Sequence, residues 1–303
     1  MKIKGSHSSL GSPSPVCCCL SSTDLYRRSS IDSNNGCENC ILDDGAVYQC
    51  SGDDESNWGH WDASRNVFGR SRIANGDSCG TSCDFWNLYR EDIERAKKMG
   101  SNSFRLSLEW SRLQPNGPEQ RFLDAEAVKR YHAILDCLED HGMDPFFSLH
   151  HYVHPQWFEN LGGFEKLENI KYFVEYCIAA FREFGSRVTY WATFNEPGVD
   201  SFAGFIHGSF PPGKMFRFKG YGLHLRNMLI AHTEAYDAIK AQPGGHKASV
   251  GIVHNWFWFE PADSCCTPFY VTLLVNLLNR MWGNDVLIKY LQTGEFDYNP
   301  LCW

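Results

Sequence analysis

Short apolar segments alternate with amphipathic stretches along most of the chain. The strand-like segments are rich in β-branched and aromatic residues and lie at 103–110, 145–149, 190–194 and 249–253. Between them apolar residues recur at helical spacing, most clearly in the stripe formed by Ile170, Phe173, Val174, Cys177, Ile178, Phe181 and Phe184. Strands that alternate with amphipathic helices predict a parallel sheet whose strands are joined by helical crossovers.

The same periodicity predicts further helices. One begins at Asp84, which can cap it, and ends at Gly100; the next begins at Asp124 and ends at Gly142. A third carries Leu225, Met228, Leu229, His232, Tyr236 and Ile239 on one face. Beyond the strand at 249–253, one more helical stretch is predicted from about 269 to 291.

The pattern is weak near the N-terminus. Residues 1–44 are rich in Ser, Cys, Asn, Asp and Gly and have no sustained periodicity, which predicts a disordered or loosely attached tail. The folded domain is expected at 45–303, with a short first strand near 46–49. Residues 51–82 are loop-like and punctuated by glycines, and loops of this length in a compact domain are usually functional.

Composition and charge narrow the functional classes. With 43% hydrophobic residues the chain can bury a sizeable core, and its net charge of −8 argues against a nucleic-acid partner, since phosphate binding relies on clustered Lys and Arg. The chain has no long apolar run, no apolar segment after its first residues and no Asn-x-Ser/Thr sequence. We therefore expect no membrane-spanning helix, no cleaved signal peptide and a cytosolic location, and the oligomeric state stays open.

The 13 cysteines are scattered and odd in number, which argues against a disulfide framework. A zinc site would need the unevenly spaced set Cys37, Cys40, Cys79 and Cys83, and that spacing fits poorly. Cys137 and Cys177 fall on the apolar faces of predicted helices. We interpret them as small core residues.

Candidate chemistry stands where the 190–194 strand stops. Asn195 and Glu196 precede Pro197, which lacks an N–H and cannot continue a central strand. A carboxylate in an aromatic cleft is desolvated, which raises its pKa toward the value that a general acid needs. The alternative for Glu196 is a solvated surface residue.

Two other strands also carry polar residues. Arg105 points inward from its strand, where a charge is costly unless it is paired; a structural salt bridge in the core is the alternative to a role in a site. His150 and His151 follow the strand at 145–149. His151 and His154 could also be read as metal ligands, but no third ligand is evident in the sequence.

Several motifs stand together in order and spacing, namely Tyr48-Gln49, Phe104-Arg105, Glu109-Trp110-Ser111-Arg112, Leu149-His150-His151, Asn195-Glu196 and Pro211-Pro212-Gly213. From about 45 to about 298 they resemble the N-terminal part of glycoside hydrolase family 1, the β-glucosidase and β-galactosidase family. The resemblance implies an α/β fold of the (β/α)8 TIM-barrel type. The five predicted strand and helix units, and the lack of a G-x-G-x-x-G after the first strand, independently favour a barrel over a nucleotide-binding sheet.

The resemblance also implies roles for individual residues. Glu196 would be the acid/base of a retaining mechanism on β-glucosides or β-galactosides, without a cofactor or metal, while Gln49, His151 and Asn195 would bind sugar hydroxyls. A surface glutamine is the alternative for Gln49.

Three supporting positions are Arg105, Tyr152 and Asn255. The family pairs this arginine with carboxylates at the floor of the site, and it usually has Trp where this chain has Tyr152. Asn255 opens the aromatic run Asn255-Trp256-Phe257-Trp258, whose rings either stack on sugar C–H faces or belong to the core.

The catalytic nucleophile of the family is absent from the sequence. The family's nucleophile lies in a Thr-Glu-Asn-Gly-like motif of the seventh strand, and neither Glu260 nor Glu295 stands in such a motif. We therefore expect a barrel truncated after about five units, in which the 303 residues neither close the barrel nor turn over substrate. The alternatives are a non-catalytic carbohydrate- or partner-binding relative and a galactolipid galactosyltransferase-like member.

Overall fold

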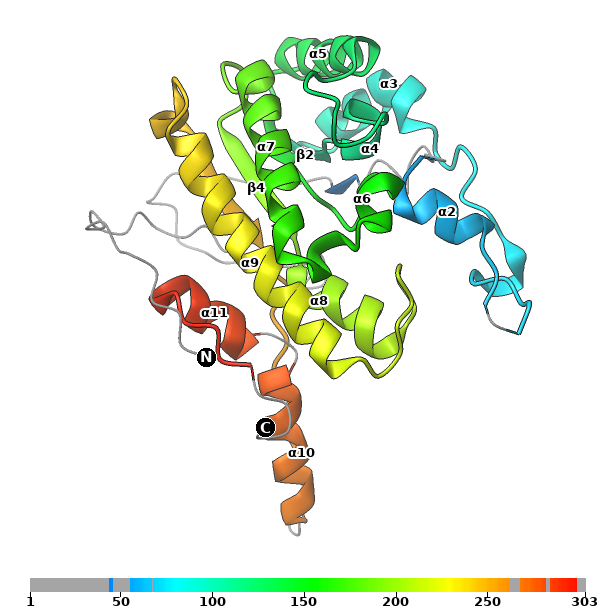
Figure 1. Cartoon of the computed structure of the whole chain (residues 1–303). Helices are drawn as coiled ribbons and strands as arrows, with labels where there is room; N and C mark the ends of the chain where they lie inside the picture. The colour runs from blue at the N-terminus through cyan, green and yellow to red at the C-terminus, as the bar shows by residue number, and fades with distance from the viewer. Residues whose placement is uncertain (1–43, 46–54, 67, 262–267, 282–283, 299–303) are drawn as a thin grey trace.

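The computed structural model describes residues 44–45, 55–66, 68–261, 268–281 and 284–298 (Figure 1). These residues contain a sheet of five parallel strands, whose spatial order β1-β2-β3-β4-β5 is also their order in the chain. The strands are β1 (Asp44–Gly45), β2 (Ser103–Ser107), β3 (Asp144–Ser148), β4 (Tyr190–Asn195) and β5 (Ser249–Val253). This is the order of successive strands in a (β/α)8 barrel.

Strands β2 to β5 lie where the sequence predicts them, with small differences at their ends, whereas β1 begins at Asp44, a residue that the sequence analysis assigned to the tail. β2 stops at Ser107 and does not reach Trp110, because the chain turns into the short helix α4 (Trp110–Leu113). β1 pairs Asp44 with Arg105 of β2. The candidate first strand at 46–49 lies outside the described residues.

A long helix precedes each of the strands β2 to β5. These helices are α3 (Phe85–Lys98), α5 (Ala125–Asp140), α7 (Ile170–Phe184) and α9 (Phe218–Lys240). The Asp124 carboxylate accepts a hydrogen bond from the backbone N–H of Ala127 at 2.9 Å, so the predicted cap of α5 is confirmed.

The predicted cap at Asp84 is wrong. The backbone of Asp84 is left-handed, with φ of 54°, whereas a capping residue is normally extended. In that conformation its carboxylate does not accept from an amide of the first turn, and its Oδ1 instead accepts from the side-chain Nδ2 of Asn87 at 2.9 Å.

Shorter helices occupy the connections and the C-terminal part. The α-helices are α2 (Asn57–Ala63), α6 (Gln156–Asn160), α8 (Pro197–Phe202), α10 (Phe269–Met281) and α11 (Asn284–Thr293). Single turns are η1 (Ala74–Gly76), η2 (Gly163–Glu165), η3 (Leu167–Asn169), the π-type η4 (Ala203–His207) and η5 (Gly245–Lys247). The predicted single helix at 269–291 is therefore two helices, α10 and α11.

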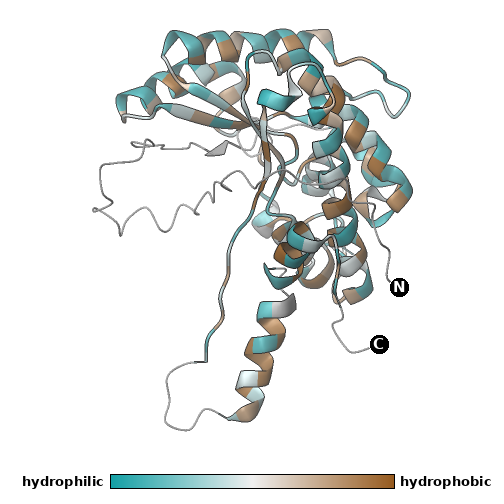
Figure 2. Ribbon diagram, turned by 90° about the vertical axis from the view of Figure 1, so that its left-hand side faces the viewer, coloured by the Kyte–Doolittle hydropathy of each residue, from teal (hydrophilic) through white to brown (hydrophobic). Residues whose placement is uncertain are grey.

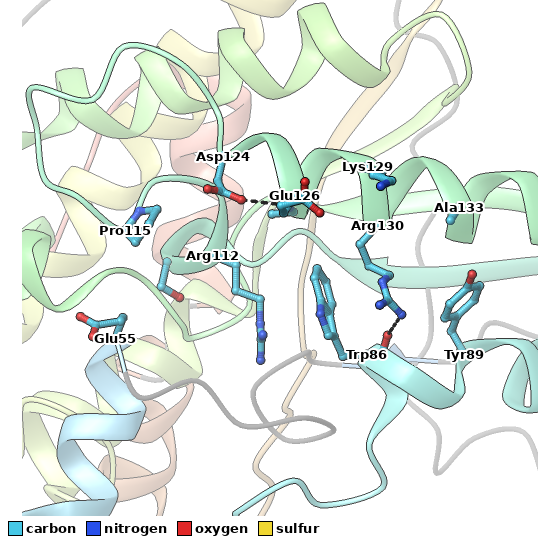
Figure 3. A pocket seen from close by; sticks show the side chains of 12 residues that line it. Glu55, Trp86, Tyr89, Arg112, Pro115, Asp124, Glu126, Lys129, Arg130 and Ala133 are labelled. Carbon is cyan, nitrogen blue, oxygen red and sulfur yellow. Dashed lines mark hydrogen bonds between the residues drawn. The ribbon is translucent and has the colours of Figure 1, made fainter.

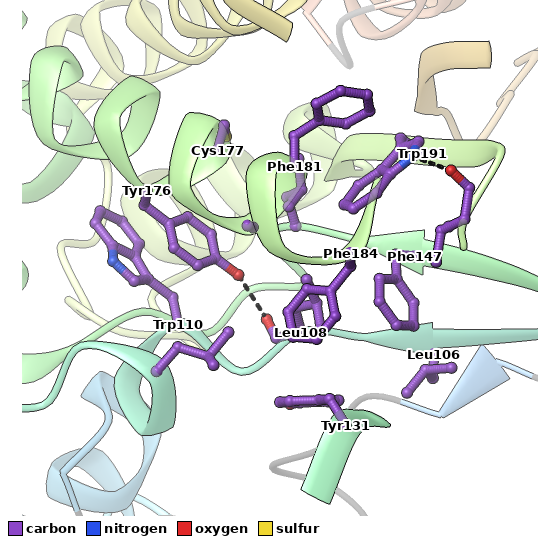
Figure 4. Packing of buried hydrophobic residues seen from close by; sticks show 14 of the residues in the cluster. Leu106, Leu108, Trp110, Tyr131, Phe147, Tyr176, Cys177, Phe181, Phe184 and Trp191 are labelled. Atoms are coloured by element: carbon purple, nitrogen blue, oxygen red, sulfur yellow. Dashed lines mark hydrogen bonds between the residues drawn. The ribbon is translucent and has the colours of Figure 1, made fainter. Parts of the chain in front are cut away.

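The main core lies between the sheet and its covering helices, and Figure 4 shows its centre. Trp110 is fully buried and stacks on Tyr176 at 5.0 Å between ring centroids, while Tyr176 donates its hydroxyl to the carbonyl of Leu108 at 3.2 Å. Cys137 and Cys177 are buried free thiols in this core, as predicted. Cys79 and Cys83 are also free thiols, and Cys37 and Cys40 lie outside the described residues.

α10 extends away from the sheet in Figure 1, and Figure 2 shows hydrophobic residues along it. The exposed apolar side chains on this helix are Phe269, Tyr270, Leu273 and Leu274. Despite this apolar face, none of the helices in the described ranges has the length and hydropathy that crossing a bilayer requires.

Candidate active site

Arg105 organises the floor of the candidate site. It lies in the middle of β2, a strand whose five residues are all buried. Its Nε donates to Ser148 Oγ at 2.8 Å, and its Nη2 donates to Asn195 Oδ1 at 2.7 Å. A buried guanidinium is tolerated when hydrogen bonds satisfy its donors, so these two bonds tie β2 to the ends of β3 and β4. Because Asn195 accepts with Oδ1, its Nδ2 stays oriented away from the arginine.

Glu196 sits where β4 turns into α8. Its backbone N–H donates to Val253 at the end of β5, at 2.8 Å, and Pro197 occupies the first helical position. The φ of Glu196 is 43°, a left-handed value that a non-glycine residue adopts at a cost of roughly 1–3 kcal/mol. Such conformations persist where the surrounding structure fixes them, and they occur preferentially at functional sites.

His151 faces the same floor, and its two neighbouring histidines do not. His151 is buried and its Nδ1 lies 3.2 Å from Ser107 Oγ. His150 instead contacts His154, whose Nε2 lies 2.9 Å from a Glu159 carboxylate oxygen. Within the described ranges, no three His, Cys, Asp or Glu side chains converge as metal ligands. The spacing of His151 and His154 therefore reflects two separate polar contacts.

Tyr152 joins the histidine loop to the candidate acid. Its hydroxyl donates to Glu196 Oε2, and its ring packs on Phe210 at 5.3 Å between centroids. Burial, together with the negative charge of Glu196, raises the pKa of Tyr152 far above its ordinary value, so the phenol keeps its proton. The sequence shows only that Tyr replaces the usual Trp; the bond to Glu196 was not predicted.

Two predicted site residues are not placed with these groups. Gln49 lies outside the described residues. Asn255 follows β5 by two residues and is half-buried, and the structure shows no hydrogen bond from it to the other described site residues. Of the predicted set, the structure therefore brings together Arg105, His151, Tyr152, Asn195 and Glu196.

The sequence analysis missed Asp200, a buried acidic residue on α8 close to Glu196. Asp200 lies one helical turn after Glu196, and its N–H donates to the Glu196 carbonyl at 3.1 Å. The residue is only 7% exposed. Burial and, second, the charge of Glu159 raise the pKa of Asp200 to about 8. The only signal in the sequence was the spacing of four residues between the two acidic residues, and that spacing is also common between acidic residues on a surface helix.

Replacing Asp200 with Asn is expected to stabilise the protein at alkaline pH. The folded-state pKa lies above the ordinary 3.8, so the folded state binds the proton more tightly, and stability falls as pH rises from about 4 to about 8. Asparagine resembles the protonated acid and has no such proton to lose. Urea unfolding should show Asp200→Asn gaining several kcal/mol on the wild type between pH 4.5 and pH 8. The exposed Asp237→Asn is the control, and a gain independent of pH would contradict the prediction.

A separate hollow lies on the outer side of the sheet, beside α3, α4 and α5 (Figure 3). In it Arg112 lies over the Trp86 ring at 4.8 Å, and Arg130 donates to the Trp86 carbonyl at 2.7 Å. Its lining includes none of the residues around Glu196. The cationic side chains here hold helices together, and we place the candidate site at the strand ends.

Comparison with known families identifies the family to which this arrangement of strands and polar residues belongs. The sequence model of glycosyl hydrolase family 1 matches residues 44–286, which is most of the chain. The chain belongs to glycosyl hydrolase family 1. The predicted resemblance and the barrel-type fold class are thereby confirmed. The polar residues of the candidate site therefore stand at the ends of the strands β2, β3 and β4 of a family 1 barrel.

Several family 1 proteins are similar to this chain. β-Glucosidase 24 of Arabidopsis thaliana is 36% identical over 206 residues, covering 62% of this chain and 39% of its own length. A 6-phospho-β-galactosidase of Staphylococcus aureus is 37% identical over 184 residues, covering 59% and 38%. The structure of a Thermotoga maritima β-glucosidase in complex with deoxynojirimycin matches with a TM-score of 0.74 and 26% identity, covering 86% of this chain and 58% of that chain.

The chain thus spans less than two fifths of the length of these curated relatives. The matched part contains β2, β3 and β4 with the residues that they deliver to the site.

Proposed function

We propose that this part of the family 1 barrel forms the sugar-binding floor and the acid/base of a site for β-glucosides or β-galactosides. The observation that carries the proposal is the convergence of the three strand ends through Arg105: its bond to Asn195 orients the residue directly before Glu196. The similarity to a β-glucosidase and to a 6-phospho-β-galactosidase of the family supports a β-glycoside as the substrate class.

Asn195 and His151 are the proposed ligands of the sugar. Asn195 accepts from Arg105 with its Oδ1, and its amide, which lies next to the Tyr152 hydroxyl, is the proposed donor to a sugar hydroxyl. His151 is anchored through Nδ1 at Ser107, close to the ends of the same strands, and its imidazole is the proposed partner of a second hydroxyl. A vicinal pair of hydroxyls suits one donor and one adaptable ring nitrogen. Gln49 is proposed as a third ligand, from the resemblance alone.

Glu196 is the proposed acid/base. In a retaining glycosidase one carboxyl group protonates the leaving oxygen, and a second attacks the anomeric carbon to form a covalent glycosyl-enzyme. Glu196 stands beside Asn195 and is fixed by backbone bonds on both sides, since its N–H contacts β5 and its carbonyl accepts from α8. No metal or cofactor enters this chemistry.

Binding of deoxynojirimycin, a glucose-shaped iminosugar, tests the proposal without requiring turnover. His151→Ala and Asn195→Ala are each expected to weaken binding about tenfold or more, because each removes a hydrogen bond in a buried site. Isothermal titration calorimetry on the 303-residue chain measures the change in Kd.

His246→Ala provides the matched control, because this exposed histidine lies in η5, ahead of the N-terminal end of β5. It should bind like the wild type. Equal binding by all four proteins, or no measurable binding by the folded wild type, would refute the proposed sugar site.

A further inference from the structure

Tyr152 and Glu196 are joined in an unusual way. Both are non-glycine residues with left-handed backbones, at φ of 65° and 43°, and the hydroxyl of one donates to the carboxylate of the other. Each backbone conformation costs free energy that only surrounding contacts can offset. Two such residues bonded to each other, at the ends of neighbouring strands, indicate a geometry that the fold maintains.

The backbone of Tyr152 is held from outside the sheet. Its carbonyl accepts hydrogen bonds from Asn57 Nδ2 at 3.2 Å and from Trp58 Nε1 at 3.0 Å. Asn57 also accepts, through Oδ1, the backbone N–H of His154 at 3.0 Å. The first turn of α2 therefore clamps the loop on both sides of Val153, and the loop cannot relax Tyr152 to an ordinary conformation without losing these bonds.

The ring of Tyr152 is held as well. It packs edge-on against Phe210, which in turn packs on Trp58 at 4.9 Å between centroids. The three aromatic rings come from α2, the loop after β3 and the loop before α9. Because they support one another, the phenol is held against Glu196 and does not rotate freely.

The chemistry of this bond opposes the proposed acid role. The phenol keeps its proton, so it can act only as a donor toward Glu196. A donor favours the ionised form of the carboxylate that accepts from it. A general acid has to carry a proton before the reaction starts.

We infer that Tyr152 is a positioning residue of the proposed site: its hydroxyl holds Glu196 in place as an ionised acceptor through Oε2, so a proton that Glu196 takes up for a leaving group is carried on Oε1. The phenol proton stays on Tyr152 throughout, and the proton that Glu196 then takes comes from solvent. The inference rests on the proposed function for its catalytic meaning, whereas the bond itself is a property of the chain.

Other titratable groups face this pair. Asp200 on α8 is acidic and is itself influenced by Glu159 on α6. Arg105 on β2 acts through Asn195, and His151 packs against the Tyr152 ring. Of these, Asp200 holds its proton at neutral pH and adds little charge there. The effect of the Tyr152 hydroxyl on the pKa of Glu196 must therefore be separated from the effects of these groups, by a substitution that removes the hydroxyl alone.

Tyr152→Phe removes the hydroxyl and keeps the ring. With carboxyl-¹³C-labelled glutamate in the full 303-residue chain, NMR titration gives the pKa of Glu196, and Glu196→Gln identifies its signal. We expect Tyr152→Phe to raise that pKa by about one unit or more, the size of one hydrogen bond to a charged group. Tyr190→Phe, which removes the hydroxyl of an exposed tyrosine at the opposite end of β4, should leave it within a few tenths of a unit.

An unchanged pKa in Tyr152→Phe would overturn the inference, and so would an equal rise in Tyr190→Phe. If Tyr152→Phe does not fold, Tyr152→Leu provides the same test, since leucine also has no hydrogen-bond donor. The titration needs no sugar, so its outcome is independent of deoxynojirimycin binding. A failed binding experiment would refute the proposed function and leave the Tyr152 result standing.

Discussion

Hydrolysis of 4-nitrophenyl β-glucoside by the 303-residue polypeptide is expected to be slower than hydrolysis by a family 1 β-glucosidase by about four orders of magnitude or more. The retaining route needs a second carboxyl group roughly 5–5.5 Å from the acid/base, and the sequence contains no Thr-Glu-Asn-Gly-like segment to supply it. Glu260 is exposed and accepts from Trp258 at 2.9 Å, while Glu295 is exposed beside Lys289. Neither is held at the site.

Parallel assays of the wild-type chain and Glu196→Gln, with a complete family 1 β-glucosidase as the positive control, measure this expectation. Deoxynojirimycin binding without turnover in either protein would match a chain that recognises the glycon and lacks the nucleophile. Ordinary turnover by the wild type that Glu196→Gln abolishes would contradict it and would require a nucleophilic carboxylate elsewhere in these 303 residues.

Trp110→Ala should have the largest effect on stability, a loss of about 3–5 kcal/mol. Trp110 is fully buried and contacts four rings, those of Trp157, Phe158, Phe173 and Tyr176. Its indole N–H donates to Gln114 at 2.8 Å. Truncation leaves a cavity among rings too large to collapse and an amide without its partner, and chemical denaturation followed by circular dichroism measures the loss.

Phe122→Ala is the matched control, because this aromatic side chain is 83% exposed. Its truncation should change the free energy of unfolding by less than about 0.5 kcal/mol. A similar small change for Trp110→Ala would show that the rings around it do not form a single packed unit.

Periodicity was sufficient to predict most of the regular elements. β5 spans the predicted residues, and the stripe from Ile170 to Phe184 is α7, because a short apolar run and an apolar stripe at helical spacing are distinct patterns. The inward arginine was predictable too, since strand alternation alone directs Arg105 toward the sheet interior. The side chains that Arg105 contacts there could not be predicted, because they depend on the register of β2, β3 and β4.

The Tyr152 to Glu196 bond could not be predicted in this way. It joins residues 44 positions apart, and it depends on two left-handed backbones that tyrosine and glutamate rarely adopt. The wrong cap at Asp84 has the same cause. A residue type indicates which side-chain bonds are available, but the backbone conformation that selects among them is set by tertiary contacts.

The identity of spatial order and chain order in the sheet has a consequence for synthesis on the ribosome. From β2 to β5, each strand pairs with the strand made just before it, so no strand has to wait for a later segment to find its neighbour. Translation adds roughly 5–20 residues per second, and segments can fold in the order in which they emerge. The bond between Arg105 and Asn195 spans 90 residues, and it can form as soon as β4 has left the exit tunnel. The nascent chain can thus assemble the floor of the site before α9 and β5 have left the exit tunnel.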